Sequence, residues 1–240
     1  MDNLARKKES GDKTILFDLS QTTVREMNQI LHHDLEKEKP GPVKITHPDG
    51  AHNIAVGLDA PVNVDIEGHA GYFCAGMNKQ AHVTIHGNVG WSVAENIMSG
   101  LVRVKGFASE SAAASGHGGT VIIERDASLR CGISMKGVDI VVGGSVGNFS
   151  AFMAQAGHLV ICGDAGDGLG DSIYEAVIYV RGKIKSLGAD AQIESMTDDD
   201  HRILKDLLAR AGFGYEPKEF KKVASARGLY HWNADANQEY

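Results

Sequence analysis

Aliphatic residues recur at every nineteenth position through the middle of the chain. Seven consecutive repeats carry a β-branched aliphatic residue at one position and another aliphatic residue two positions earlier. Apolar residues two positions apart are typical of a β-strand, because alternate side chains of a strand point to the same face. The later set is Ile66, Ile85, Val104, Ile123, Val142, Ile161 and Val180. The earlier set is Val64, Val83, Val102, Val121, Ile140, Leu159 and Ile178.

A third column holds only small residues, nine positions after the first aliphatic set. A repeat of this length is too short for two packed helices, and short strands joined by corners of small residues are typical of one coil of a parallel β-helix. The pattern therefore predicts a right-handed parallel β-helix of about seven coils, with the aliphatic columns in its core and ~4.8 Å between coils. The small column is Ala75, Ala94, Ala113, Gly132, Ala151, Gly170 and Ala189.

A strand and a helix are expected before the repeats, where they would cover one end of the rod. An exposed end of a β-helix promotes aggregation, so such ends are usually covered. Residues 14–20 predict a short strand. Thr23 and Glu26 form a capping box that opens a helix, and Pro40-Gly41-Pro42 ends it.

A second helix is expected after the repeats. Thr197 is a suitable N-cap, and the acidic residues 198–200 that follow it favour the positive end of a helix. Gly212 is the expected C-terminal stop. From residue 213 to residue 240 the chain shows no clear period, so we expect an irregular tail that includes Tyr230 and Trp232.

These patterns divide the chain into three parts. Residues 43–60 look like an imperfect leading coil, in which Ile45 lies one period before Val64. The predicted parts are an N-terminal arm with a capping helix (residues 1–42), the parallel β-helix (residues 43–195) and the C-terminal helix with its tail (residues 196–240).

One column on the outer face of the strands changes character along the rod. Its first three members, Asp65, Thr84 and Arg103, are polar, as a wet face requires. The next four are apolar, and such a stripe of stacked apolar side chains is expected to be covered. Either the chain's own C-terminal helix and tail or a partner subunit could cover it, so these four residues form a candidate interface. They are Ile122, Val141, Val160 and Tyr179.

Charge and terminal composition argue against several classes of partner. The chain has 24 basic and 31 acidic residues in 240, a net charge of -7. Nucleic acids and anionic membranes both favour clustered basic residues, so neither is expected as a partner. The first 13 residues are polar, and no apolar run approaches the ~20 residues that cross a bilayer. We therefore expect a cytoplasmic protein.

The sequence offers no strong candidate for catalysis or metal binding. Cys74, Cys131 and Cys162 form no C-x-x-C pair, and the histidines show no metal-binding spacing. Cys74 and Cys131 share a column about 14 Å apart, too far for a disulfide, so they are expected to be small buried residues. The glycine-rich stretch 163–171 is expected to form coil corners, because a dinucleotide fingerprint requires a helix after it.

The segment Gly166-Asp-Gly168-Leu-Gly170, set inside 19-residue coils, resembles the "GXGXG" β-helix domain at the C-terminal end of the glutamate synthase large subunit. The closer likeness is to the free-standing form of that domain. It also includes residues 17–28, the stretch 178–190 and the tail residues 223–233. The resemblance covers nearly the whole chain and makes Gly166, Gly168 and Gly170 a structural motif.

The resemblance implies a function for a complex rather than for this chain alone. In that family the free-standing chain accompanies a class II amidotransferase-like subunit and an FMN-binding, glutamate-synthase-like subunit. The best-known assembly is N-methylglutamate synthase (methylamine–glutamate N-methyltransferase), which forms N-methylglutamate and ammonia from methylamine and glutamate. The family places the flavin and the iron–sulfur chemistry on the companions, which implies no catalytic, cofactor or metal site on this chain.

Two other functions remain open from the sequence. A similar coil occurs in the β-helix subunit of formylmethanofuran dehydrogenase or formyltransferase complexes, although the leading helix and the tail fit that class less well. A stand-alone β-helix enzyme acting on polysaccharide would need a groove lined with carboxylates and aromatic residues. Aromatic residues make up only 6% of this chain.

Overall fold

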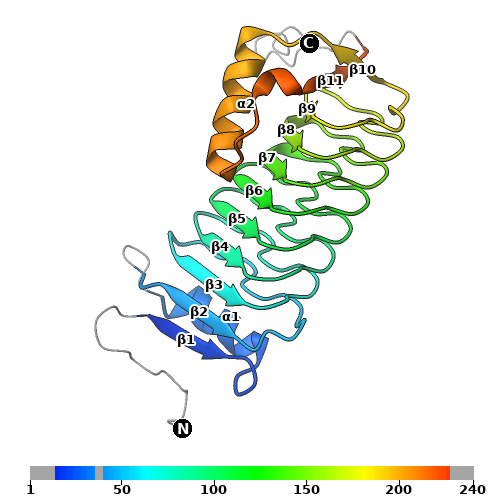
Figure 1. The fold of residues 1–240 in the computed structure, drawn as a ribbon. Helices are drawn as coiled ribbons and strands as arrows, with labels where there is room; N and C mark the ends of the chain where they lie inside the picture. Colours follow the sequence, from blue (N-terminus) through cyan, green and yellow to red (C-terminus); the bar gives the residue numbers. More distant parts are fainter. Residues whose placement is uncertain (1–13, 36–39, 228–240) are drawn as a thin grey trace, which may run out of the picture.

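The strands of the protein stack into one continuous sheet that runs along a rod (Figure 1). The structure is a computed structural model, and it describes residues 14–35 and 40–227. Within these residues the sheet order is β1-β2-β3-β4-β5-β6-β7-β8-β9-β11-β10. The strands are β1 (Ile15–Asp18), β2 (Val43–Thr46), β3 (Asn63–Glu67), β4 (His82–Ile85), β5 (Leu101–Val104), β6 (Thr120–Ile123), β7 (Lys136–Val142), β8 (Ala156–Ile161), β9 (Val177–Val180), β10 (Ala191–Glu194) and β11 (Lys221–Ser225).

The predicted parallel β-helix is confirmed. From β3 to β9 each strand pairs in parallel with the next, and the core residues lie beside their equivalents one repeat later, as in Val64 with Val83 and Ile66 with Ile85. The register shifts only at the start of β7, where Lys136 lies beside Ala156. Both aliphatic columns are buried along their whole length. A second row of parallel bridges links Ala70, Val89 and the equivalent residues of later coils. Each coil is therefore held to the next on more than one side.

The predicted register of the leading coil is wrong by two positions. Strand β2 pairs Val43 with Val64 and Ile45 with Ile66, so this first coil is two positions longer than the later repeats. A shift of two positions keeps the same side chains on the core face, because alternate residues of a strand share a face. The hydrophobic pattern could not distinguish the two registers.

The turn of each coil contains residues in the left-handed backbone conformation at every second position. In one coil these are Ser111, Ala113 and Ser115, with φ of 62°, 56° and 54°. The middle residue belongs to the small column, and φ is positive there in every repeat except at Ala189. The left-handed backbone is one reason why this column holds only small residues, because a larger side chain raises the cost of that conformation.

Helix α1 (Val24–His33) covers the N-terminal end of the core. Thr23 and Glu26 form the predicted capping box. The side chain of Asn28 donates to the carbonyl of Asn53 at 2.7 Å and accepts from the N–H of Ala55 at 3.1 Å. In later coils the N–H equivalent to that of Ala55 donates to the preceding coil, as Ala75 does to Ile54, so Asn28 replaces the acceptor that a preceding coil would have supplied.

The C-terminal end of the rod is closed by a change of strand direction. Strand β11 lies antiparallel between β9 and β10, pairing Val223 with Ile178 on one side and with Ile193 on the other. Residues 213–227 are therefore more regular than predicted, with the 3-10 helix η1 (Pro217–Glu219) leading into β11. Tyr230 and Trp232 lie outside the described residues, and the predicted part boundaries at 42 and 195 stay predictions.

Helix α2 (Asp198–Ala211) lies against the outer face of the strands. It begins at Thr197 with a capping box and ends at Gly212, whose φ of 81° gives the left-handed stop that the sequence predicts. No helix in the described part of the chain is long and apolar enough to cross a membrane.

We predict that Ser111→Gly raises the free energy of unfolding by about 1 kcal/mol, because glycine adopts the left-handed conformation without the cost of a Cβ atom. Denaturant titration of the pure protein measures this. Ser109→Gly is the matched control, since Ser109 lies two positions earlier in the same coil and its φ is not positive. Equal stabilisation by both substitutions would contradict the explanation.

Candidate functional site

The three glycines of the Gly166–Gly170 motif serve two different purposes. Gly168 and Gly170 have φ of 66° and 68°, and they occupy the left-handed turn positions that Ser111 and Ala113 occupy in another coil. Gly166 has no positive φ, but a Cβ atom there would lie 2.5 Å from Oδ1 of Asn148 and 2.8 Å from its backbone nitrogen. The motif is thus part of the coil geometry of the rod.

Polar side chains at the neighbouring corner bind the backbone of the next coil. Oδ1 of Asp126 accepts from the N–H of Ser145 at 2.7 Å, and Oγ of Ser145 accepts from the N–H of Asp164 at 2.9 Å. Oδ1 of Asp164 accepts from the N–H of Lys183 at 2.7 Å. These oxygens satisfy N–H groups within the rod, as expected of coil corners.

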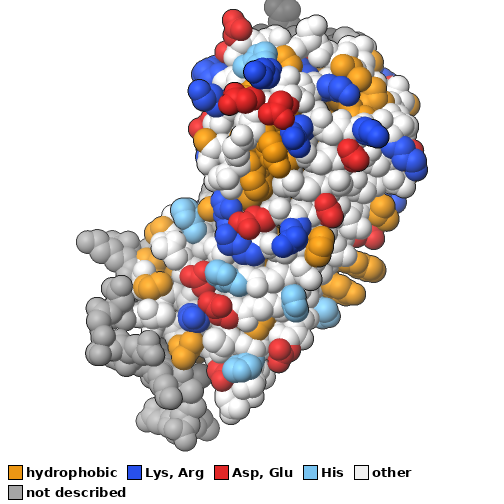
Figure 2. Space-filling model, in the orientation of Figure 1, with side chains coloured by type: hydrophobic (Ala, Val, Ile, Leu, Met, Phe, Trp, Pro, Cys, Tyr) orange, Lys and Arg blue, Asp and Glu red, His pale blue; other side chains and the backbone are white. Residues whose placement is uncertain are grey.

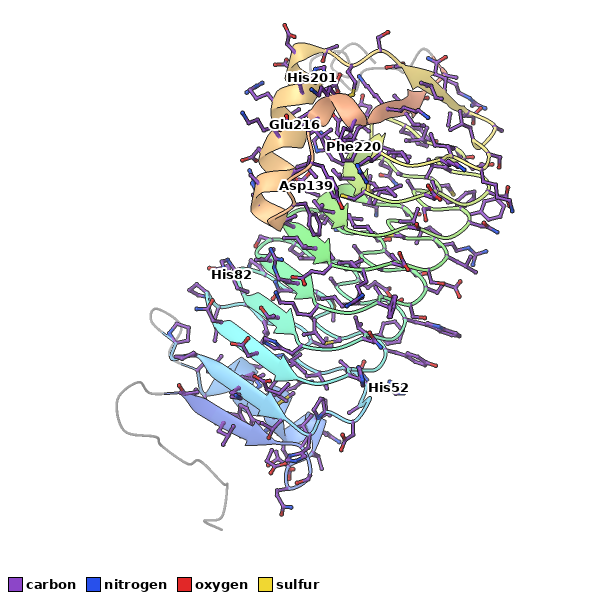
Figure 3. All side chains as sticks on the ribbon, in the orientation of Figure 1. His52, His82, Asp139, His201, Glu216 and Phe220 are labelled. Atoms are coloured by element: carbon purple, nitrogen blue, oxygen red, sulfur yellow. The ribbon has the colours of Figure 1, made fainter. Side chains whose placement is uncertain are left out.

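The apolar stripe predicted as an interface is covered by the chain itself. Ile122, Val141, Val160 and Tyr179 are each 0% exposed. They form one core cluster with the apolar face of α2 and with Phe220, which precedes β11 (Figure 3). This corrects the interface interpretation in favour of the alternative that the sequence left open. The covering residues include Leu204, Leu207, Leu208 and Ala211.

The last polar member of the same column binds the end of α2. The guanidinium of Arg103 donates from Nη1 to the carbonyl of Ala211 and from Nη2 to that of Arg210, both at 3.1 Å. It also pairs with Glu124 at 2.9 Å. A cation at a helix C-terminus is favourable, because the free carbonyls there carry partial negative charge.

Beneath the start of α2 a buried carboxylate joins the helix to the sheet. Asp200 accepts from the hydroxyl of Tyr179 at 2.8 Å, from Nζ of Lys222 at 3.2 Å, and from the N–H and hydroxyl of Thr197 at 2.8 and 2.7 Å. Burial opposes ionisation, but these donors outweigh it and lower the pKa of Asp200 to about 2. Burial raises the pKa of Tyr179 above its ordinary value, and the nearby Asp200 carboxylate adds a smaller increase.

An aspartate–histidine pair lies beside this cluster. Nδ1 of His158 is 2.7 Å from Oδ1 of Asp139, and the imidazole ring lies parallel to the ring of Tyr179, with 6.2 Å between centroids. Asp139 projects from β7 near α2 (Figure 3). Catalysis by such a pair would also require a positioned substrate. The two residues occupy one column in successive coils, and comparing that column for opposite charges would have identified the pair.

The cysteines do not form a reactive site. Cys74, Cys131 and Cys162 are buried and unpaired. Burial raises the pKa of each thiol to about 12. In Cys162 the positive charge of Arg181 opposes part of this increase. Thiols with a raised pKa are poor nucleophiles and metal ligands. Within residues 14–35 and 40–227, no three acidic, histidine or cysteine side chains gather as a metal site would require.

The exposed hydrophobic side chains gather on one edge of the rod, where the left-handed turns lie. We call it the turn edge, and it comprises residues 72–79 and the equivalent segments of the later coils. Figure 2 shows hydrophobic side chains standing out from the edge on the side opposite α2. Nine of the eleven large hydrophobic residues that are exposed in the described chain lie on it. They are Tyr72, Phe73, Met77, Trp91, Met98, Leu129, Phe149, Met153 and Tyr174.

At the lower end of the turn edge three rings form a stack. His52 and Tyr72 have ring centroids 4.3 Å apart, and Tyr72 and Trp91 are 4.9 Å apart, with nearly parallel planes. The labelled His52 marks the start of this stack in Figure 3. The sequence pattern did not identify this edge, because no turn position carries an exposed apolar residue in every coil.

Comparison with known proteins gives one informative result. No protein-family model matches the sequence. The chain is 49% identical over 226 residues to Protein GlxC of Rhizobium meliloti (strain 1021), an alignment that covers 94% of this chain and 99% of that protein.

We predict that Gly166→Ala destabilises the protein more than Gly170→Ala. The added Cβ atom at Gly166 would overlap Asn148, and such overpacking costs about 1–3 kcal/mol. At Gly170 the nearest atom would be 3.1 Å away, and alanine already occupies this position in five other coils, so the cost should stay near ~1 kcal/mol. Thermal or denaturant unfolding of both variants measures the difference. An equal loss would show that the backbone conformation matters more than the contact with Asn148.

We predict that Asp200 makes the stability of the protein sensitive to acid. Its folded pKa of about 2 lies below the ordinary value of 3.8, so the carboxylate stabilises the fold above pH 3.8 and loses this effect as the pH falls towards 2. Asp200→Asn should cost about 2 kcal/mol at pH 6 and progressively less in acid. Unfolding titrations of wild type and variant between pH 6 and pH 2 measure this difference.

Tyr179→Phe provides the matched comparison for this cluster. It removes one donor and leaves the carboxylate in place, so it should show part of the same pH dependence. If the Asp200→Asn protein loses as much stability in acid as the wild type, the assignment is wrong.

Proposed function

Because the chain belongs to the family of Protein GlxC, we propose that it works as a non-catalytic subunit of a glutamate-synthase-like enzyme complex. The complex in this proposal is N-methylglutamate synthase, which converts methylamine and glutamate to N-methylglutamate and ammonia. Its partners would be a class II amidotransferase-like subunit and an FMN-binding, glutamate-synthase-like subunit. The flavin and the iron–sulfur chemistry would belong to these companions.

The observation that carries the proposal is the position of the glycine motif in the coil. Gly168 and Gly170 occupy left-handed turn positions of a regular parallel β-helix, and Gly166 makes the close approach to the preceding coil. This is the setting in which the motif resembles the GXGXG domain of glutamate synthases. The match to Protein GlxC over 99% of its length supports a free-standing form of that domain.

The role in the complex would be to hold the companion subunits in a fixed relation. Each coil of the rod is hydrogen-bonded to the next and stacked on a continuous aliphatic core, so the rod resists bending. Two subunits bound at different levels of such a rod would keep a constant separation. That arrangement suits a reaction in which ammonia or an amine passes between two active centres.

The ring stack does not present Tyr72 as a polysaccharide-acting enzyme would require. Sugar-binding aromatic residues present a free ring face to the ligand, as stacking requires. Here both faces of the Tyr72 ring are covered, one by His52 and the other by Trp91. Its exposed part is therefore the ring edge.

Co-expression with the two proposed companions tests the function. We expect a tag on this chain to retain both companions, to give a yellow preparation with one flavin per complex, and to support formation of N-methylglutamate from methylamine and glutamate. An unrelated tagged β-helix protein is the control for non-specific retention. A chain that purifies free of the flavin subunit would contradict the proposal. An intact complex that uses a different nitrogen donor would support the proposed subunit role but contradict the proposed reaction.

A further inference from the structure

Two coils of the turn edge carry the same unusual pair of side chains. Phe73 and Met77 occur in one coil, and Phe149 and Met153 occur four coils later in the same positions. All four residues have left-handed backbones, with φ between 54° and 58°. All four are also exposed, by 44%, 54%, 45% and 44% respectively.

These pairs do not benefit the isolated fold. The left-handed conformation is costly for a bulky residue, and an exposed side chain gains little burial in return. The coils between the two pairs place polar residues at the same positions, namely Ser92, Asn96, Ser111, Ser115, Arg130 and Ser134. A contact outside the chain would explain why large apolar side chains occur in only these two coils.

We propose that the turn edge joins two copies of this chain in an antiparallel dimer. The Phe–Met pairs lie ~19 Å apart along the rod at ~4.8 Å per coil, and the coil midway between them contains Ala113. A twofold axis through this coil, perpendicular to the edge, reverses both the rod and the turn. It places Phe73 against Met153 of the second copy and Met77 against Phe149 of the second copy. Sulfur–aromatic contacts of this kind are favourable.

The other side chains on the turn edge match under the same operation. The axis pairs the end of the turn segment one coil below it with the start of the turn segment one coil above it in the second copy. This brings Met98 near Leu129 of the second copy. The operation places Trp91 opposite position 135 of the second copy, beside Lys136, whose ammonium group suits a cation–π contact with the indole. In the central coil Glu110 faces position 116 of the second copy, beside His117. Complementary charge and apolar character in these pairs favour a second copy of the chain over an unrelated partner.

Sedimentation of the full chain over a range of concentrations tests the dimer. We expect a dimer that the double substitution Phe149→Ser with Met153→Ser weakens by about 100-fold or more, because symmetry removes all four Phe–Met contacts. Serine already occupies these turn positions in other coils, so the variant should fold, as circular dichroism and unfolding can check. Ile193→Ser is the matched control, since Ile193 is 57% exposed but lies away from the turn edge.

Disulfide trapping tests the antiparallel direction. Ser92 and Ser134 lie one coil below and one coil above the axis, so Ser92→Cys with Ser134→Cys should give a covalent dimer on mild oxidation. Ser92→Cys alone should not, because the native cysteines are buried. A chain that is monomeric at every concentration, or a dimer that the Phe149→Ser/Met153→Ser protein retains, would overturn the proposal. So would a monomer whose turn edge instead binds the flavin subunit.

Discussion

Parallel pairing of each coil with the next is the interaction on which the rest of the structure depends. The strands from β3 to β9 keep one constant register, so each side chain lies above its equivalent one coil earlier. Stacked aliphatic columns then form a continuous core, and the backbone groups of each strand are satisfied by its neighbours. Side chains of one type that recur every 19 residues therefore form a continuous stripe along the rod.

The same repetition sets the demands on the turns. The chain must reverse within a few residues while its N–H groups still reach the next coil, and alternate left-handed residues meet this demand. Glycine is the least costly choice, as at Gly168 and Gly170, but serine, alanine and even phenylalanine occur elsewhere. The GXGXG motif is thus one coil in which glycine fills turn positions that every coil has.

The long sides of the rod differ in what covers them. On the strand side, the outer column changes from polar to apolar between Arg103 and Ile122, where helix α2 ends. A helix of 14 residues spans ~21 Å, close to the ~19 Å that separates Arg103 from Tyr179 four coils later, so α2 is long enough to cover the whole apolar stripe. The turn edge has no such cover within the described residues, and its apolar side chains remain exposed. Proposed contacts with other chains therefore belong to that edge and not to the stripe.

The sequence alone determined the coil period, the core columns and both helix caps, because each depends on spacing along the chain and on local hydrogen bonding. Thr23, Thr197 and Gly212 are examples of such local signals. Tertiary structure decided three other features: the register of Ile45, the antiparallel insertion of β11, and the choice of α2 as the cover for Tyr179. A slip of two positions preserves the pattern, and an apolar stripe does not specify what will cover it. Only contacts between residues far apart in the chain distinguish these outcomes.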